Sequence, residues 1–138
     1  MRPRQVRDLM TDHVFSLRPH DDLATLYDLM DTKHIRHVPI VDRDGDLVGL
    51  VTHRDLSRSA LGPQDELPLS MQRDMLRRRK IREIMATEVE TVEPDDDLKL
   101  AAEMLLENKI GCLAVAEGEH LVGILTEADF VRLYIENP

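Results

Sequence analysis

Apolar and polar positions along the chain follow a pattern that occurs twice. An apolar run of strand length at residues 47–51 is followed by Thr-His-Arg-Asp at 52–55, and then by helical periodicity. The same order returns with an apolar run at 121–125 and Thr-Glu-Ala-Asp at 126–129. Residues 52–55 are termed the first motif and residues 126–129 the second motif. A short apolar run bounded by turn residues predicts a buried strand, so each motif is expected where a strand leads into a helix.

The repeat extends well beyond these motifs. Pro19 aligns with Pro94 at an offset of 75 residues (94 − 19), and Gly49 aligns with Gly123 at an offset of 74 (123 − 49) after one deletion. Two copies are too few for a solenoid, which stacks many repeats. They predict two similar halves related by a pseudo-two-fold axis.

Each half is expected to fold in the order β-α-β-β-α, which places the chain in the α/β (α+β) class. A short apolar segment leads into each half, at residues 6–10 and 81–85, and its methionine is expected to pack in the core. Asp22 and Asp97 are expected to open helices whose apolar residues recur at i, i+3, i+4 and i+7. The predicted strands lie at residues 14–17, 38–41 and 47–51 in the first half and at 89–92, 113–116 and 121–125 in the second.

A segment rich in glycine, proline and acidic residues separates the halves. It divides the chain into a first repeat at residues 6–60, a linker at 61–80 and a second repeat at 81–138. Within the linker, Ser70 is expected to cap a helix that ends in four cations at 77–80. These cations fit either a solvated helix end or a nucleic-acid patch, and the acidic composition of the chain favours the helix end.

Composition narrows the classes of function. The 138 residues are 42% apolar and 33% charged, which is enough for a globular core with a soluble surface. A net charge of −9 argues against broad nucleic-acid affinity, because such binding needs a basic face. A single cysteine excludes an internal disulfide and a cysteine zinc cluster. No apolar run approaches about 18 residues and no signal-like region follows the first residues, so we expect a cytoplasmic protein without membrane contact.

The simplest interpretation of Thr-x-x-Asp is a helix cap. The threonine hydroxyl accepts from the backbone N–H three residues on, and the aspartate lies near the positive end of the helix dipole. This arrangement resembles a capping box with Asp in place of the usual Glu. The occurrence of the same cap in two matching contexts favours a role beyond capping.

Taken together, these motifs resemble a known family. A short strand, proline, a helix, Val-Pro-Ile-Val-Asp, glycine and Leu-Val-Gly-Leu-Val-Thr-x-x-Asp-Leu follow in order, and a related series returns in the second half. This order, over residues 6–134, is similar to a tandem CBS-domain pair, or Bateman module. The linker and Ile-Arg-Glu-Ile-Met at 81–85 are similar to stand-alone CBS proteins of the acetoin-utilisation type. The resemblance implies two repeats packed sheet to sheet, with two clefts between them.

The resemblance also implies a function. CBS pairs are regulatory, ligand-sensing modules, and adenosine compounds such as AMP, ADP, ATP or S-adenosylmethionine often bind in their clefts. In the family the Asp accepts hydrogen bonds from ribose hydroxyls and the Thr contacts ribose or phosphate. These roles are thereby implied for Thr52 with Asp55 and for Thr126 with Asp129. The chemistry fits, because an ionised carboxylate can accept both donors of a ribose diol. No cofactor is implied beyond such a regulatory ligand.

The two implied clefts differ in charge. Glu127 in the second motif would repel a phosphate, whereas the first motif has His53 and Arg54. We therefore expect the Asp55 cleft to be the better nucleotide site. The resemblance also implies basic contacts to phosphate and contacts to the base from the opposite half. The residues at these places are Lys33, His34, Gly111, Cys112 and Leu113 for the Asp55 cleft, and Arg36, His37 and Val38 for the Asp129 cleft.

Structural interpretations stay open for several of these residues. His53 and Arg54 also fit an exposed helix surface. The scattered histidines lack metal-ligand spacing, so no metal site is expected. Cys112 fits a small core or cleft residue, since no base pattern accompanies it. No Gly-rich phosphate loop or nucleophile elbow stands out in the sequence, so we expect no enzymatic activity.

Two functions therefore compete. In the first, the protein is an adenine-nucleotide sensor that regulates an unidentified protein partner. In the second, the clefts are vestigial and the protein is a dimerisation scaffold. A homodimer is expected in either case, because Leu56 and the pattern of Phe130, Leu133 and Tyr134 offer apolar helical faces for a symmetric interface.

Overall fold

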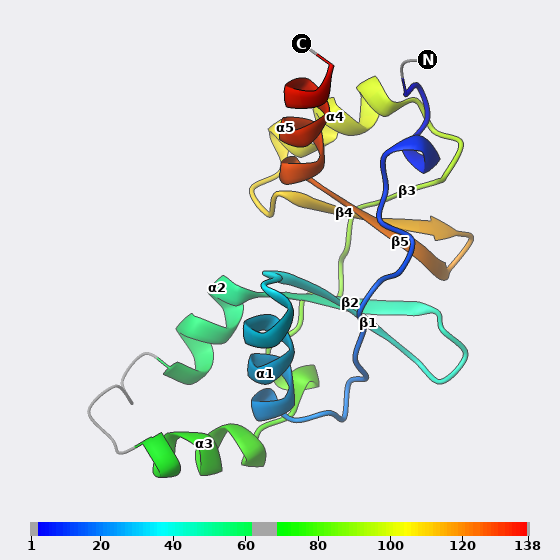
Figure 1. The fold of residues 1–138 in the computed structure, drawn as a ribbon. Helices are drawn as coiled ribbons and strands as arrows, with labels where there is room; N and C mark the ends of the chain where they lie inside the picture. The colour runs from blue at the N-terminus through cyan, green and yellow to red at the C-terminus, as the bar shows by residue number, and fades with distance from the viewer. Residues whose placement is uncertain (1–2, 62–68, 138) are drawn as a thin grey trace. The chain divides into compact units, whose positions relative to one another are not determined.

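The computed structural model describes residues 3–61 and 69–137. These residues form two compact units that do not follow the order of the sequence. In Figure 1 the blue N-terminal segment accordingly lies with the orange and red C-terminal elements. Unit 1 holds residues 3–14, 45–47 and 89–137, and unit 2 holds residues 15–44, 48–61 and 69–88.

Unit 2 is built on a two-stranded sheet. Its strands, β1 (His37–Val41) and β2 (Leu47–Thr52), pair with each other, and Gly45 supplies a positive φ of 85° in the turn between them. A tight turn favours glycine at such a position, because a residue without a Cβ adopts positive φ without strain. The helical elements of this unit are α1 (Leu23–Lys33), α2 (His53–Leu56), the π-helical turn η2 (Ser57–Leu61), α3 (Leu69–Arg78) and the 3-10 turn η3 (Ile81–Glu83).

Unit 1 contains a three-stranded sheet in the order β3-β4-β5. β3 (Thr91–Val92) runs parallel to β4 (Cys112–Glu117), which is antiparallel to β5 (His120–Thr126). In this register Cys112 lies opposite Thr126, the first residue of the second motif. The helical elements are the 3-10 turn η1 (Val6–Asp8), α4 (Leu98–Glu107) and α5 (Glu127–Glu136).

The first predicted strand of each half is shorter than expected. The prediction of a strand at residues 14–17 is wrong, because the described chain there forms only an isolated parallel bridge from Leu17 to Ile40. The strand predicted at 89–92 is reduced to β3. In both halves a proline follows two residues after the last paired position, where its missing N–H prevents the ladder from continuing.

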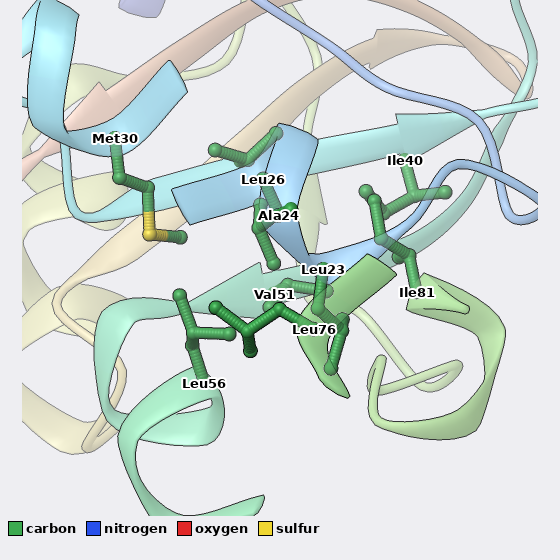
Figure 2. Packing of buried hydrophobic residues seen from close by; sticks show 10 residues of the cluster. Leu23, Ala24, Leu26, Met30, Ile40, Val51, Leu56, Leu76 and Ile81 are labelled. Atoms are coloured by element: carbon green, nitrogen blue, oxygen red, sulfur yellow. The ribbon is translucent and has the colours of Figure 1, made fainter. Parts of the chain in front are cut away.

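Each unit has its own aliphatic core. In unit 2, side chains from α1, β1 and η3, including Leu23, Ile40 and Ile81, are fully buried, and Figure 2 shows how they pack together. In unit 1, Leu125 is one of the fully buried members of the core. Burial of each such side chain favours folding by about 1.5–3 kcal/mol. Leu56 is also fully buried in unit 2, so the prediction that it lies on an exposed helical face is wrong.

Side-chain caps open α1 and α4 where the sequence predicts them. Asp22 accepts a hydrogen bond from the Thr25 backbone N–H at 2.8 Å, and Asp97 accepts one from the Lys99 backbone N–H at 3.0 Å. The predicted linker helix is present as α3. Among the described residues α3 begins at Leu69, and the side chain of Ser70 lies outside what the structure describes, so the expected cap stays a prediction.

The two leading segments, residues 6–10 and 81–85, exchange units. Residues 6–10 begin the first repeat but pack in unit 1, where Val6 is fully buried. Residues 81–85 begin the second repeat but pack in unit 2, where Ile81 is fully buried. The Val6 backbone N–H donates to the Asp96 carbonyl at 3.0 Å, and the Ile81 backbone N–H donates to the Asp21 carbonyl at 2.9 Å. Each unit is therefore completed by the leading segment of the other repeat.

Two glycines allow the leading segments to approach the strands closely. Met10 lies against Gly123 in β5, and Met85 lies against Gly49 in β2. A Cβ atom on either glycine would come within 2.7 Å of the methionine sulfur, which is too short for any real contact. Both methionines are half-buried against the core of their unit. The prediction that they serve packing is therefore confirmed.

Candidate functional site

The first motif lies where β2 leads into α2. Thr52 Oγ1 accepts a hydrogen bond from the Asp55 backbone N–H at 3.2 Å, and Asp55 Oδ2 accepts one from the Thr52 backbone N–H at 2.9 Å. This reciprocal pair is a capping box with Asp in place of Glu, as the sequence predicts. It fixes the carboxylate and leaves its second oxygen, Asp55 Oδ1, with no hydrogen-bond partner among the described residues.

Basic residues flank the first motif in the same unit. His53 is half-buried and Arg54 is exposed, and both lie in the first turn of α2. The His53 backbone N–H donates to the Arg36 carbonyl at 2.8 Å. This hydrogen bond ties the start of α2 to the residue before β1, so it brings Arg36 next to the motif.

Lys33 and His34 lie at the C-terminal end of α1, and both are exposed. His34 is the C-cap of the helix, with a left-handed φ of 54°. The Lys33 ammonium lies 5.2 Å from the centre of the Phe15 ring, which is a cation–π contact. Within the described ranges neither side chain has a hydrogen bond or ion pair with the first motif. The expectation that they contact the same ligand stays a prediction.

The second motif lies where β5 leads into α5, and its aspartate has more partners. Asp129 Oδ2 accepts hydrogen bonds from the Thr126 backbone N–H at 2.8 Å and from the Thr126 hydroxyl at 3.3 Å. Asp129 Oδ1 accepts one from Arg132 Nη2 at 2.6 Å. The aspartate is 5% exposed. Both oxygens of this buried carboxylate therefore already have donors.

Gly111 and Cys112 lie beside the second motif. The Gly111 carbonyl accepts from the Glu127 backbone N–H at 3.2 Å, and Cys112 is buried opposite Thr126. Burial raises the pKa of the Cys112 thiol to about 12, and the negative charge of Asp129 adds to this effect. The thiol is thus protonated at neutral pH, and a protonated thiol is a poor nucleophile.

The other predicted contact residues lie on β1 and β4. Val38 and Leu113 are fully buried in the two cores, so they can offer a ligand only backbone groups. His37 is half-buried at the start of β1. The sequence prediction groups residues 111–113 with Asp55 and residues 36–38 with Asp129. Each grouping takes residues from both units, so it stays a prediction.

Arg132 and Asn108 are polar residues near the second motif that the sequence prediction missed. Asn108 Oδ1 accepts from the Gly111 backbone N–H at 3.1 Å, and Asn108 Nδ2 donates to the Cys112 carbonyl at 3.3 Å. These bonds shape the loop before β4. Arg132 follows Asp129 by three residues, and that spacing on a helix is the sequence signal for the pair. For Asn108 we find no comparable signal.

Two other features of unit 1 contain no motif residue. An open hollow of about 500 Å³ is lined by residues that include Arg4, Lys99 and Phe130. Glu93, Asp95 and Asp96 form the one group of acidic, histidine or cysteine side chains in the described chain that is close enough to share a metal ion. Asp96 Oδ2 accepts from the Glu93 backbone N–H at 2.8 Å, so this group also stabilises its own turn. Over residues 3–61 and 69–137, no helix is long and apolar enough to span a bilayer.

Several solved structures share this fold over nearly the whole chain. A Vibrio cholerae protein named for acetoin utilization (AcuB) is 36% identical, with a TM-score of 0.81, covering 99% of this chain and 93% of that one. The CBS domain pair of protein MJ0100, in complex with 5′-methylthioadenosine and S-adenosyl-L-methionine, is 25% identical with a TM-score of 0.82, covering 99% and 100%. CBSX2 in complex with AMP is 25% identical with a TM-score of 0.80, covering 97% and 98%.

Relatives found by sequence include proteins of very different length. A homoserine O-acetyltransferase from Methanocorpusculum labreanum is 31% identical over 127 residues, which cover 91% of this chain. The chain spans only 23% of the length of that enzyme. The CBS domain-containing protein YhcV from Bacillus subtilis is 27% identical over 134 residues, which cover 96% of this chain and 86% of YhcV. The acetyltransferase match therefore concerns one part of a longer protein.

The family model of the CBS domain matches residues 6–62 and 81–136. The two matched stretches make up most of the chain, and each contains one Thr-x-x-Asp motif. The resemblance to a tandem pair is thus confirmed, together with the mixed α and β fold class. The chain belongs to the CBS domain family and carries two CBS domains in tandem.

Proposed function

We propose that this CBS pair is a regulatory module that binds an adenosine compound through the first motif. The observation that carries the proposal is the state of Asp55. Its Oδ2 is held by the Thr52 backbone N–H at 2.9 Å, and its Oδ1 has no partner among the described residues. An ionised carboxylate only accepts hydrogen bonds and a ribose diol donates two. A fixed carboxylate with an unused oxygen therefore suits this ligand.

The ligands of the similar structures support an adenosine compound. MJ0100 was solved with 5′-methylthioadenosine and S-adenosyl-L-methionine, and CBSX2 was solved with AMP. Adenosine is common to all three ligands. For this chain we infer AMP, ADP, ATP or S-adenosylmethionine as the regulatory ligand. His53 and Arg54 favour a phosphorylated compound, because hydrogen bonds from cations to phosphate are charge-assisted.

The proposed role is regulatory and not catalytic. Cys112 has a thiol pKa raised to about 12, so it does not supply a thiolate nucleophile at neutral pH. A regulatory module acts because its ligand binds one conformation more tightly than another, and the shift in population changes a partner protein. The partner is a protein of still unidentified type.

A homodimer is the second part of the proposal. Val131, Tyr134 and Ile135 on α5 are 59%, 74% and 69% exposed, so this helix presents an apolar face to its surroundings. Phe130 and Leu133 are half-buried against the unit 1 core, which restricts the predicted face to the other side of α5. Exposed apolar faces of this kind are commonly buried in symmetric dimers.

Calorimetry with AMP, ADP, ATP and S-adenosylmethionine tests the ligand, and GMP serves as a control that lacks the adenine base. We expect saturable binding of at least one adenosine compound. At 100 times its dissociation constant, this ligand should stabilise the fold by about 2.7 kcal/mol in thermal unfolding. If no adenosine compound binds at millimolar concentration, the competing scaffold function is correct. Light scattering tests the dimer, and a monomer at micromolar concentration would count against it.

A further inference from the structure

Arg132 donates a hydrogen bond to the Asp129 carboxylate, which is the group in the second motif that a ligand would contact. Its Nη2 donates to Asp129 Oδ1 at 2.6 Å, while the backbone N–H and the hydroxyl of Thr126 both donate to Oδ2. The Asp129 side chain is 7% exposed and the Arg132 side chain is 62% exposed. The carboxylate is therefore buried beneath a guanidinium that faces solvent.

The first motif has an arginine at the same spacing without this contact. Arg58 follows Asp55 by three residues, as Arg132 follows Asp129. Arg58 is exposed and lies in the π-helical turn η2, and it has no hydrogen bond or ion pair with Asp55 in the described chain. By contrast, α5 is α-helical from residue 127 to residue 136, and residues three apart on an α-helix are neighbours on one face.

We infer that Arg132 closes the second motif to hydroxyl donors, and that it thereby determines that an adenosine ligand binds at one motif and not at two. The guanidinium takes the place that a ribose hydroxyl would otherwise take on Asp129 Oδ1. This inference rests on the proposed function, because it treats the second motif as a closed counterpart of the first. Arg132 lies outside the motif and sets specificity from one helical turn further along the chain.

The strength of the pairing explains why a ligand would not displace Arg132 readily. The bond between Arg132 and Asp129 joins two ionised groups, so it adds the attraction of opposite charges, which a hydroxyl donating to the same carboxylate does not supply. Displacement would also leave a buried carboxylate without its cation, which is unfavourable in a poorly solvated position. The exposed Glu127 in the same turn adds a second negative charge that disfavours phosphate.

Calorimetry on the full chain with 5′-methylthioadenosine tests the inference, because this probe has the ribose diol but no phosphate for Glu127 to repel. Wild-type protein is expected to bind one equivalent per chain. Arg132→Met keeps the length of the side chain but removes its donors, so this variant is expected to bind two. In an Asp55→Ala background, which removes the first acceptor, Arg132→Met should raise the remaining affinity by at least about tenfold. The matched control Arg58→Met should change neither value.

The outcomes separate the inference from the proposed function. A folded Arg132→Met protein that binds one equivalent with unchanged affinity would overturn the inference and leave the proposed function intact. Two equivalents on wild type would overturn it as well. If neither wild type nor Arg132→Met binds any adenosine compound, the proposed function is wrong.

NMR on wild-type protein tests the closure without a variant or a ligand. The Nε–H group of Arg132 is expected to be as ordered as the backbone of α5, with a heteronuclear NOE close to that of its amides. The Nε–H group of Arg58 is expected to be motionally averaged. If the two arginines prove equally mobile, the inference is overturned, even where Arg132→Met does not fold.

Discussion

The two Thr-x-x-Asp motifs have the same spacing but different hydrogen bonding. In the first motif one oxygen of Asp55 accepts from a backbone N–H, and the other has no partner among the described residues. In the second motif Asp129 accepts from three donors and is buried. The two motifs therefore share a sequence pattern, but only the first has a carboxylate oxygen that is available to a ligand.

The helix that follows each motif explains this difference. α5 continues without a break for ten residues, so Arg132 lies on the same face as Asp129. α2 ends after four residues and continues as the π-helical η2, which contains Arg58. A π-helical turn is wider than an α-helical one, so residues three apart no longer share a face. Identical arginine spacing thus gives an ion pair in one repeat only.

The largest expected effect compares the two aspartates in ligand binding. Asp55→Ala should weaken AMP binding by about 100-fold or more, because hydrogen bonds to a charged group contribute about 1.5–3 kcal/mol each and a ribose diol makes two. Asp129→Ala should change AMP affinity by less than about threefold, because its acceptor is already in use. Calorimetry on both variants measures the difference. Equal losses would show that the motifs are equivalent.

In stability the order is expected to be reversed, with a larger loss for Asp129→Ala than for Asp55→Ala. Asp129→Ala removes the acceptor of three hydrogen bonds and should lower the free energy of unfolding by about 2–4 kcal/mol. Asp55→Ala removes one capping contact and should cost about 1 kcal/mol. Urea unfolding with an unchanged m-value measures both. A larger loss at Asp55 would contradict the comparison.

Arg54→Ala sharpens the comparison within the first motif. Removal of one charge-assisted contact to phosphate should weaken AMP binding by about tenfold and leave uncharged adenosine unaffected. Arg58→Ala is the matched control, since Arg58 is also exposed but lies beyond the motif. Competition binding with AMP and adenosine on both variants distinguishes a lost contact to phosphate from a general loss of adenosine binding. The same loss for both ligands would argue against a phosphate contact at Arg54.

The smallest expected effect is a loss of stability at alkaline pH that depends on Cys112. The first repeat has His37 at the aligned position, so it has no such thiol. Burial and then the charge of Asp129 raise the thiol pKa to about 12 in the folded protein, from 9.0 for an unburied thiol. Below pH 9 the thiol is protonated in both the folded and the unfolded chain, so its contribution to stability is fully present. Between about pH 9 and 12 the thiol ionises only in the unfolded chain, so stability falls by up to about 1.4 kcal/mol per pH unit.

Cys112→Ala removes this group and provides the test. Urea unfolding at several alkaline pH values should show a shallower decline for the variant than for wild type. Parallel curves for the two proteins would mean that the thiol pKa is not raised in the folded state.

Local signals in the sequence predicted a large part of the fold. The caps at Asp22 and Asp97 depend on contacts within three residues, and both form. The strand at residues 14–17 fails because a strand needs a partner, and only Leu17 has one. Leu56 fits an apolar helical face in the sequence, but periodicity does not reveal whether a core or another chain covers that face.

The candidate site was predictable to a similar degree. The reciprocal hydrogen bonds of the first motif follow from Thr-x-x-Asp alone. The spacing of Arg132 and Arg58 was also visible, but the helix type that follows each motif was not. The exchange of the leading segments depends on contacts between residues far apart in the chain, such as Val6 with unit 1, and local periodicity carries no information about these.

The exchanged leading segments impose an order on folding during synthesis. Unit 2 takes its residues from positions 15–88, so all of its elements are synthesised before unit 1 is complete. Residues 6–10 are made long before the α4 and β5 residues that share a core with Val6, such as Leu98 and Leu125. At roughly 5–20 residues per second, the interval from residue 10 to residue 89 lasts roughly 4–16 s. During that time the apolar segment at residues 6–10 has no partner from β3, α4, β4, β5 or α5, so unit 1 can form its core only after residue 89 is made.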